Sequence, residues 1–237
     1  MPADALKILR EGEMEVLGLL PYSSNYTFLA KVSSPDEQLL AVYKPRRGER
    51  PLWDFPPGSL AAREVAAYRV SEEAGWNIVP PTVLRRDAPL GEGSVQLFIE
   101  HDPERHYFVL MDEYRDELAA FAAFDVVANN ADRKSGHVLE DPHRELWAVD
   151  HGVTFHAEPK LRTVIWDYAE EPISDGIRHA LERLRASLSD ERKLGGEMAR
   201  LLTPAERSAT LHRVEALLAR SDFPSPGPDR PVPWPLI

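Results

Sequence analysis

The 237-residue chain contains no cysteine. Disulfide cross-links, thiolate metal sites, cysteine nucleophiles and palmitoyl anchors are therefore excluded. Long hydrophobic runs are also missing, and the first residues lack the basic start and apolar core of a signal peptide. We therefore expect a cytoplasmic protein with no membrane span and no stable membrane anchor.

Basic residues are fewer than acidic ones. Lysine and arginine together number 28, aspartate and glutamate 39, and the formal net charge is −11. This charge opposes binding to nucleic acids and to anionic lipid surfaces unless a local basic patch is present. We expect a monomer without a nucleic-acid partner, large enough for one domain or for two small lobes around a cleft.

The first half of the chain predicts a small sheet with one helix. Short apolar runs alternate with segments rich in serine, proline, glycine and aspartate, which is typical of strands and their turns. The alanine-rich segment 59–75 predicts a helix with Ser59 as its N-cap and Gly75 at its end. The predicted strands are residues 14–20, 27–32, 39–44, 79–86 and 93–100.

The second half predicts a mainly helical region with one short hairpin. Thr203-Pro204 is typical of a helix start, and prolines exclude a helix from the tail, residues 223–237. That tail is either disordered or packed on the surface through Trp234. The predicted elements are a long helix at 107–130, strands at 137–141 and 145–150, and two or three amphipathic helices within 173–188 and 201–221.

Two charged residues of the first half are candidates for phosphate chemistry. Lys44 closes an otherwise apolar strand, and Glu64 lies among alanines of the predicted helix. A strand lysine paired with a helix glutamate orients the lysine towards nucleotide phosphates in kinase-like folds. The alternative is a solvated lysine and an ordinary helix glutamate, and charge placement alone leaves both open.

The turn between the first two strands, Ser23-Ser24-Asn25, would lie over the same cleft. It contains no glycine, so its composition is not that of a glycine-rich phosphate loop. Small polar residues can nevertheless present N–H groups and hydroxyls to a phosphate. A plain hairpin turn is the alternative.

The densest cluster of polar residues is the segment NNADRKSGHVLEDPHRELWAVDHGVTF, residues 129–155. A loop followed by a hairpin would bring Asp132, His137 and Asp150 to one end of that hairpin. Two carboxylates and a nitrogen ligand facing a lysine could hold a hydrated divalent ion that bridges phosphates. A hairpin with surface charges is the alternative. The remaining histidines lack the spacing of a zinc site, and no G-x-S-x-G elbow marks a serine hydrolase.

Five segments, in order along the chain, are similar to one known family. They are AVYKPRRGE, AAREVAAYRVSEEAGWNIVPPTVL, GSVQLFIE, FDVVANNADRKSGHVL and WAVDHGVTF. They resemble the catalytic domain of the phosphatidylinositol 3-/4-kinase superfamily, most of all the type II phosphatidylinositol 4-kinases and an actinobacterial-type group of bacterial proteins similar to them. The resemblance implies an α+β, two-lobed protein-kinase-like fold, with an N-lobe at 1–102, a C-lobe at 103–222, the proline-rich tail at 223–237, and ATP between the lobes.

The resemblance also implies roles for individual residues. Asp132 matches the catalytic aspartate of the family's Asp-Arg motif, with Arg133 beside it, and Asp150 matches the metal-binding aspartate. His137 stands where the family has a metal-binding asparagine, and imidazole suits Mn²⁺ better than Mg²⁺. The implied nucleotide-binding residues are Ser23, Ser24 and Asn25 at the phosphate turn, Lys44 and Glu64 at the phosphates, Val42 above the adenine, Leu139 and Val149 below it, and Phe98, Ile99 and Glu100 at its edge.

The function implied by the resemblance is transfer of the γ-phosphate of ATP to a hydroxyl, with Mg²⁺ or Mn²⁺ as the metal. The acceptor is a lipid, a protein or a small molecule. The family's cysteine-rich palmitoylation segment is absent and the net charge is −11, which together favour a soluble acceptor. The family's phosphate-loop glycines are also absent, which, with His137, motivates the pseudokinase alternative. Two alternatives stay open: a nucleotide-binding pseudokinase that acts as a regulatory module, and an enzyme that transfers AMP.

Overall fold

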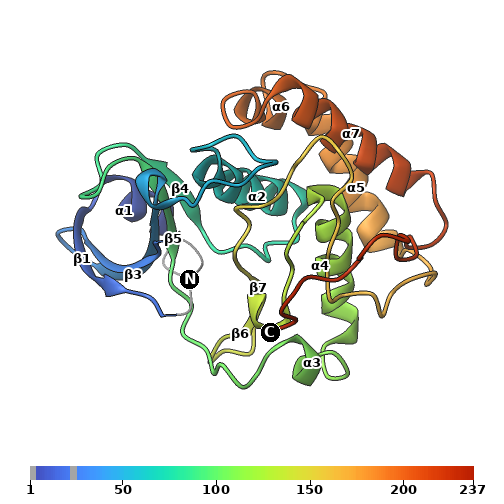
Figure 1. Ribbon diagram of the computed structural model, residues 1–237, viewed down its shortest axis with the longest axis horizontal. Coiled ribbons are helices and arrows are strands. Elements are labelled where there is room, and N and C mark those ends of the chain that lie inside the picture. The colour runs from blue at the N-terminus through green and yellow to red at the C-terminus, as the bar shows by residue number, and fades with distance from the viewer. Residues whose placement is uncertain (1–3, 22–25) are drawn as a thin grey trace.

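The computed structural model describes residues 4–21 and 26–237 and combines an antiparallel sheet with a mainly helical region. Figure 1 shows the sheet at one side, helices α4 to α7 at the other, and α2 with the hairpin β6–β7 between them. The sheet has the strand order β1-β2-β3-β5-β4, and all its pairings are antiparallel. Its strands are β1 (Glu13–Leu19), β2 (Phe28–Ser33), β3 (Gln38–Pro45), β4 (Thr82–Arg85) and β5 (Gly93–Leu97).

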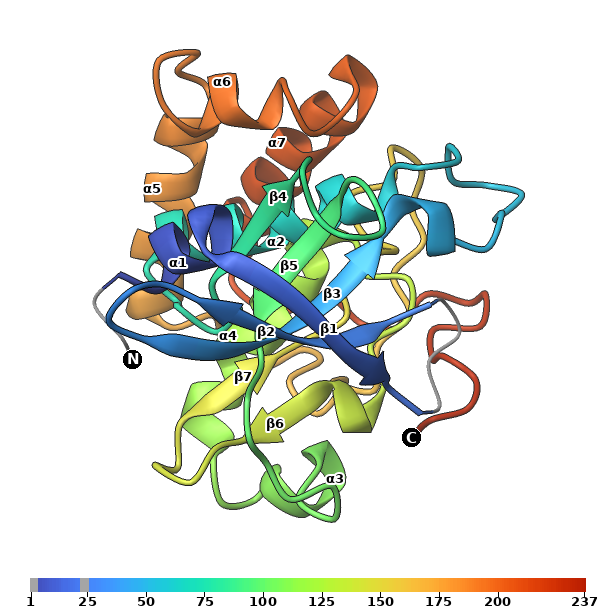
Figure 2. The ribbon, with the colours of Figure 1, turned by 90° about the vertical axis from the view of Figure 1, so that its left-hand side faces the viewer.

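Each face of the sheet packs against a helix. Alternate residues of β3, such as Ala41 and Tyr43, are buried together with the short helix α1 (Ala5–Glu11), around which the sheet curves (Figure 2). The opposite face carries Lys44 and is covered at β4 and β5 by α2 (Leu60–Ala74). Helix α1 was not predicted, because seven residues carry too little periodicity to stand out.

Helix α2 begins differently from the prediction. The Ser59 side chain makes no capping hydrogen bond; instead Glu49 Oε1 accepts from the N–H of Ala61 at 3.2 Å. A side chain ten residues upstream of Ser59 takes the place of the local cap, which a local pattern cannot indicate. At the other end Gly75 adopts the left-handed conformation with φ 71°, as the sequence suggests.

The helical region contains two corrections to the predicted elements. The long helix predicted at 107–130 is broken at Met111–Tyr114, where Glu113 reaches Arg105 at 2.7 Å. His137 ends a 3₁₀ turn and does not open a strand. Three helices follow the hairpin, within the two or three that the sequence predicts. The elements are α3 (Tyr107–Leu110), α4 (Arg115–Ala128), the 3₁₀ turn Ser135–His137, β6 (Val138–Glu140), β7 (Leu146–Ala148), α5 (Asp175–Leu188), α6 (Leu194–Met198) and α7 (Pro204–Leu218).

The tail packs on the helical region, but Trp234 is not its anchor. The Trp234 side chain is 76% exposed, whereas Phe223 is buried. Backbone carbonyls hold the segment: Pro231 O accepts from the N–H of Thr163 and from the indole of Trp166, both at 3.0 Å. Proline removes N–H donors but keeps its carbonyl, so a proline-rich strand docks by accepting hydrogen bonds.

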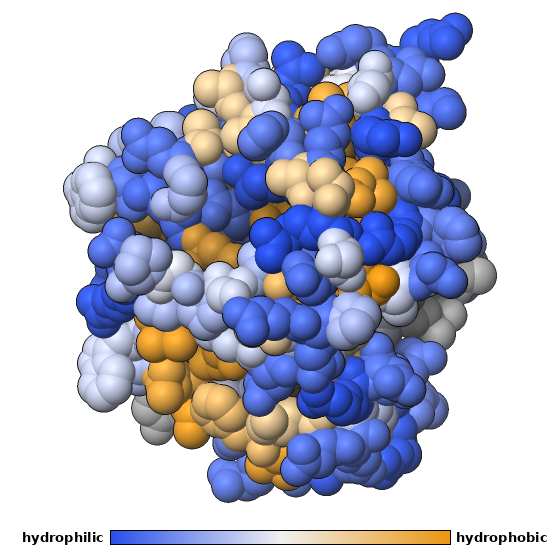
Figure 3. Space-filling view, turned by 90° about the vertical axis from the view of Figure 1, so that its right-hand side faces the viewer, coloured by the Kyte–Doolittle hydropathy of each residue, from blue (hydrophilic) through white to orange (hydrophobic). Residues whose placement is uncertain are grey.

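The surface is mainly polar on the face that Figure 3 shows, with hydrophobic residues in small separate groups. Within residues 4–21 and 26–237, no helix is both long and apolar enough to cross a membrane.

A buried ion pair ties α2 to α7. The Arg63 side chain is 1% exposed and donates to Glu206, whose side chain is 7% exposed, and to the carbonyl of Thr154 at 2.5 Å. Glu206 also accepts from the N–H of Thr203 at 2.9 Å and so belongs to the cap of α7. One guanidinium therefore fixes α2 against a loop and a helix that follow it by some ninety residues or more.

We expect Arg63→Met to lower the free energy of unfolding by about 3 to 5 kcal/mol, because it leaves the Glu206 carboxylate buried without its partner. Combining it with Glu206→Leu should cost less than the sum of the two single variants. Urea titration measures both, and Arg192→Ala, whose side chain is 92% exposed, is the control with a change of no more than about 0.5 kcal/mol. Additive losses would contradict the coupling.

Candidate functional site

Lys44 lies between two carboxylates. It stands near the end of β3, and its Nζ donates to Glu64 Oε1 on α2 and to Asp150 Oδ1 at 2.8 Å. Burial opposes the charge on Lys44, but Asp150 and Glu64 outweigh it and raise the pKa of the lysine above its ordinary value. Lys44 is therefore a cation at neutral pH and is held in one direction. The structure thus brings together the strand lysine and helix glutamate that the sequence singles out.

Glu64 joins three segments of the chain. Its side chain is 3% exposed, and while Oε1 takes Lys44, Oε2 accepts from the backbone N–H of His151 at 3.0 Å. The strand β3, the helix α2 and the loop after β7 therefore meet at one carboxylate. A buried carboxylate is stable when both oxygens have donors, and Glu64 meets that condition.

Asp150 stands in the loop after β7 in the left-handed backbone region, with φ 61°. Aspartate tolerates this region better than most residues, and the turn aims its carboxylate at Lys44. The positive charge of Lys44 holds the pKa of Asp150 well below its usual range, although burial acts in the other direction. Asp150 is an anion under all ordinary conditions, as a ligand for a divalent ion must be.

Asp132 lies in the loop after α4. The Asn130 side chain accepts from the Asp132 N–H at 3.0 Å, which fixes the loop, and the Asp132 carboxylate is 37% exposed. Burial raises the pKa of Asp132; the nearby Lys134 lowers it and Asp150 adds to the increase. A partly exposed carboxylate with a raised pKa is suited to accept a proton from a ligand in the solvent.

Arg133 is fully buried and does not reach the surface. It donates to the buried Asp125 at 3.0 Å, to the carbonyl of Val149 at 2.8 Å, and lies 2.8 Å from Nε2 of His151. These contacts connect the end of α4 with the segment that carries Asp150. The structure therefore gives Arg133 a positioning role, since its guanidinium has no access to an acceptor.

His137 faces Asp150, with 3.5 Å between Nε2 and Oδ2. Burial lowers the pKa of His137 to about 4, with Asp150 opposing and Arg133 adding to the effect, so the ring is neutral at pH 7. Its Nδ1 accepts from the N–H of Lys134 at 3.4 Å, which places the proton on Nε2. Metal binding at Nε2 requires that proton to move to Nδ1 and that weak hydrogen bond to be lost.

The residues present fit a divalent ion that is held mainly by Asp150. Within residues 4–21 and 26–237, no group of three acidic or histidine side chains forms a metal cage. Mg²⁺ and Mn²⁺ at phosphate sites commonly take one or two carboxylates, with water and phosphate oxygens as the other ligands. Asp150 supplies such a carboxylate, and His137 can add a nitrogen ligand after the change of tautomer.

The residues expected around the adenine come from both halves of the chain. Ile99, Leu139 and Val149 pack in one small apolar cluster, and Val42 lies on the same face of β3 as Lys44. The N–H of Phe98 is already donated to Leu40 O at 2.9 Å. The carbonyl of Ile99 lies 2.8 Å from Nδ1 of His101, so it too already has a partner. The adenine site itself stays a prediction.

Ser23, Ser24 and Asn25 lie outside the described residues, so the expected phosphate turn has no structural account. The residue that follows can be placed: the N–H of Tyr26 donates to Gly48 O at 3.2 Å. The chain leaving that turn therefore touches the 3₁₀ turn after β3.

Sequence reasoning missed several residues of this site. Lys134 follows Asp132 by two positions, and its Nζ lies 3.5 Å from Asp132 Oδ2. His151 is fully buried, and burial lowers its pKa well below the ordinary value, so it is neutral beside Arg133. The charge of Lys134 was visible in the segment DRK, whereas nothing local marks Asp125 as the partner of Arg133.

One curated protein is similar to the chain over nearly its whole length. Protein Rv2133c of Mycobacterium tuberculosis (strain ATCC 25618 / H37Rv) is 40% identical over 273 residues, which cover 99% of this chain and 96% of that protein. No family model matches the chain.

Solved kinase structures share the fold at low sequence identity. The Golgi casein kinase with Mn/ADP bound has a TM-score of 0.58 at 14% identity, covering 91% of this chain and 74% of that one. The structure of hydra Fam20 with sugar has a TM-score of 0.54 at 14% identity and covers 92% of this chain and 88% of that one. The Helicobacter pylori proinflammatory kinase CtkA has a TM-score of 0.50 at 10% identity and covers 87% of this chain and 92% of that one. The predicted α+β, two-lobed kinase-like fold is thereby confirmed; the phosphatidylinositol kinase family is not shown by these structures.

We expect Asp150→Asn to weaken Mn²⁺ binding at least about tenfold in the presence of ADP, because the variant loses the anionic ligand.

His137→Asn should shift the metal preference of the site from Mn²⁺ towards Mg²⁺, since an amide oxygen replaces a nitrogen ligand. Electron paramagnetic resonance of free Mn²⁺ measures both, with the exposed Asp112→Asn as control. Unchanged binding in Asp150→Asn would remove this residue from the metal site.

Proposed function

This chain belongs to the family of Protein Rv2133c of Mycobacterium tuberculosis, and we propose that it is an ATP-dependent phosphotransferase. It transfers the γ-phosphate of ATP to a hydroxyl of an acceptor. One observation carries the proposal: Lys44 is held between Glu64 and Asp150, with Asp132 in the loop beside them. A cation fixed by a helix glutamate, next to a permanently ionised aspartate, is the arrangement that phosphoryl transfer needs for binding and orienting phosphates.

In the proposed reaction the acceptor oxygen attacks the γ-phosphorus. The new O–P bond forms as the bond from phosphorus to the β–γ bridging oxygen breaks, and ADP leaves with that electron pair. Asp132 orients the acceptor hydroxyl and accepts its proton. Lys44 binds phosphate oxygens of the nucleotide, and Lys134, 3.5 Å from Asp132, lies where it can bind oxygens of the transferred group. A divalent ion at Asp150, when bound, neutralises phosphate charge.

The acceptor is the open part of this function. The order of the five sequence segments supports a phosphatidylinositol 3-/4-kinase-like enzyme, and we keep that as the narrower proposal. The structures of similar fold are kinases by name, among them a casein kinase bound to Mn/ADP. The net charge of −11 favours a soluble acceptor over one embedded in an anionic membrane.

A pseudokinase is the second candidate, and His137 favours it. In the described tautomer Nε2 carries the proton and points at Asp150, so this position does not offer a metal lone pair. Nucleotide binding without phosphotransfer to any component of a cell extract would support that reading. Transfer of AMP is the third candidate, and label at the α-phosphate of ATP distinguishes it from γ-phosphate transfer.

We expect purified protein to transfer label from γ-labelled ATP to an acceptor fraction of bacterial extract. Asp132→Asn should slow transfer by about 10² to 10⁴-fold with little effect on ATP affinity, because it removes the proton acceptor and not a nucleotide contact. Lys44→Ala should weaken ATP binding measured by calorimetry.

The matched control is Asp36→Asn, an exposed aspartate in the loop between β2 and β3. Its transfer rate should equal that of the wild type. Equal rates in Asp132→Asn and Asp36→Asn would refute the role of Asp132, and failure of the wild-type protein to bind ATP would refute the function as a whole.

A further inference from the structure

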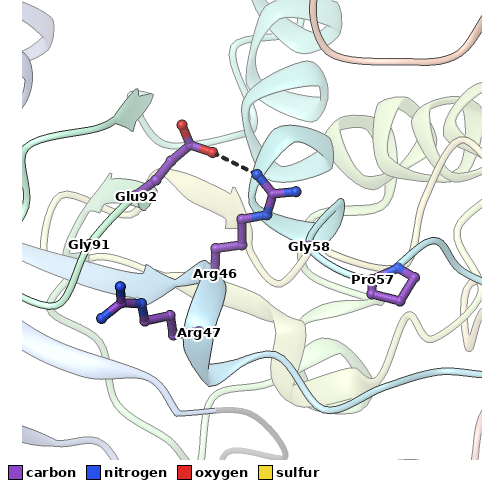
Figure 4. Close-up of a pocket in the computed structure, with 6 residues that line it drawn as sticks. All are labelled: Arg46, Arg47, Pro57, Gly58, Gly91 and Glu92. Carbon is purple, nitrogen blue, oxygen red and sulfur yellow. Dashed lines mark hydrogen bonds and ion pairs between the residues drawn. The ribbon is translucent and has the colours of Figure 1, made fainter.

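A cavity of about 470 Å³ opens at the end of β3 (Figure 4). None of Lys44, Glu64, Asp132 or Asp150 lines it. It is formed where the 3₁₀ turn after β3 meets the start of α2 and the turn between β4 and β5. Its lining residues are Arg46, Arg47, Pro57, Gly58, Gly91 and Glu92.

Two arginines, Arg46 and Arg47, line this cavity, and their side chains extend in different directions (Figure 4). Arg46 donates to Glu92 Oε1 at 3.2 Å; the Arg46 side chain is 54% exposed and that of Glu92 33%. Arg47 forms no hydrogen bond or ion pair with any residue in the ranges 4–21 and 26–237. Figure 4 shows Arg46 directed at Glu92 while Arg47 lies by Gly91. Among the described residues, Arg47 thus has no ion-pair partner, although the protein has a net charge of −11.

Two glycines of the cavity have a positive φ, and one of them, Gly58, lets Arg46 lie against the backbone. Gly58 has φ 76°, and a Cβ there would lie 2.1 Å from Arg46 Nε. Gly91 has φ 96°, and its Cβ would lie 3.9 Å from Arg47 Nε. Any other residue at Gly58 would push the Arg46 guanidinium out of its place. The cavity and the direction of Arg46 therefore depend on this close approach.

The cavity lies at the end of the strand that carries Lys44. Arg46 follows Lys44 by two positions, and Gly48, in the same turn as Arg46 and Arg47, accepts from the N–H of Tyr26, two residues before β2. A group bound in the cavity would therefore lie beside the segment that directly follows β3.

We propose that this cavity binds a phosphate group carried by the acceptor, so that the preferred acceptor is already a phosphomonoester. The proposal rests on the proposed phosphotransferase function. Guanidinium forks match the oxygens of phosphate, and two of them suit its double charge. The Glu92 carboxylate now occupies one fork, and the incoming phosphate replaces it. An exposed ion pair of this kind adds little stability, so the exchange is easy.

Binding of glycerol 3-phosphate, measured by calorimetry without nucleotide, tests the site. We expect Arg46→Ala and Arg47→Ala each to weaken binding about tenfold or more, because each removes a charge-assisted fork. Glu92→Gln should strengthen binding, since it removes the competing carboxylate.

The matched control is Arg86→Ala. It removes the same charge from the same region, but Arg86 is 87% exposed, lies 3.7 Å from Glu92 and does not line the cavity. Binding in this variant should equal that of the wild type. No binding by the wild type, or equal losses in Arg86→Ala and Arg47→Ala, would overturn the proposal.

Two further experiments are needed. One distinguishes a lipid phosphate from a soluble one, and the other distinguishes failure of the anion site from failure of the proposed phosphotransferase function. Binding to phosphatidylcholine vesicles that contain phosphatidic acid, but not to glycerol 3-phosphate, would assign the site to a lipid headgroup; binding to the free ester assigns it to a soluble acceptor. If Arg47→Ala weakens ATP binding as much as Lys44→Ala does, the cavity belongs to the nucleotide site and the proposal fails. If the wild type binds the ester but never ATP, the phosphotransferase fails and the anion site stands.

Discussion

The carboxylate of Glu64 is the contact on which the candidate site depends. One oxygen holds the ammonium of Lys44 and the other holds the backbone of His151, so a strand, a helix and a loop are set relative to one another by a single buried group. Removing it would leave Lys44 with Asp150 as its one carboxylate partner among those two and would release the backbone N–H of His151, next to Asp150. Because Glu64 is buried, its attraction to Lys44 is screened less by water than that of a surface pair would be. The site is therefore assembled electrostatically before any ligand arrives.

Neighbouring contacts keep that assembly from shifting. Arg63, next to Glu64 on α2, holds a loop carbonyl and Glu206, and Arg133 holds Asp125 together with backbone carbonyls near Asp150. Each arginine is almost fully buried, and each has its hydrogen bonds satisfied by groups from distant parts of the chain. Such networks have few alternative arrangements, because any other position would leave a buried charge without a partner. The helix that carries Glu64 is thus fixed in the position that engages Lys44.

The sequence indicated the parts of the site whose signals are local. A charge at the end of an apolar strand identified Lys44, and order along the chain identified Asp132 and Asp150. The sequence could not show the contacts between residues that are far apart in the chain. The cap of α2 comes from Glu49, and the break between α3 and α4 follows contacts of Glu113 with residues that no periodicity connects to it. The cavity at Arg46 is of the same kind, since three separate loops form it.

Helix α2 lies between strands of the sheet in the sequence, but its buried face belongs to the core of the helical region. Ala66, Ala67 and Val70 of α2 are buried in the same apolar cluster as Phe121 and Phe124 of α4. A fragment ending near the middle of the chain would leave that face of α2 in water, so the sheet is not an independently folding module. Helix α2 packs against both the sheet and the helices, so unfolding should proceed as one cooperative event.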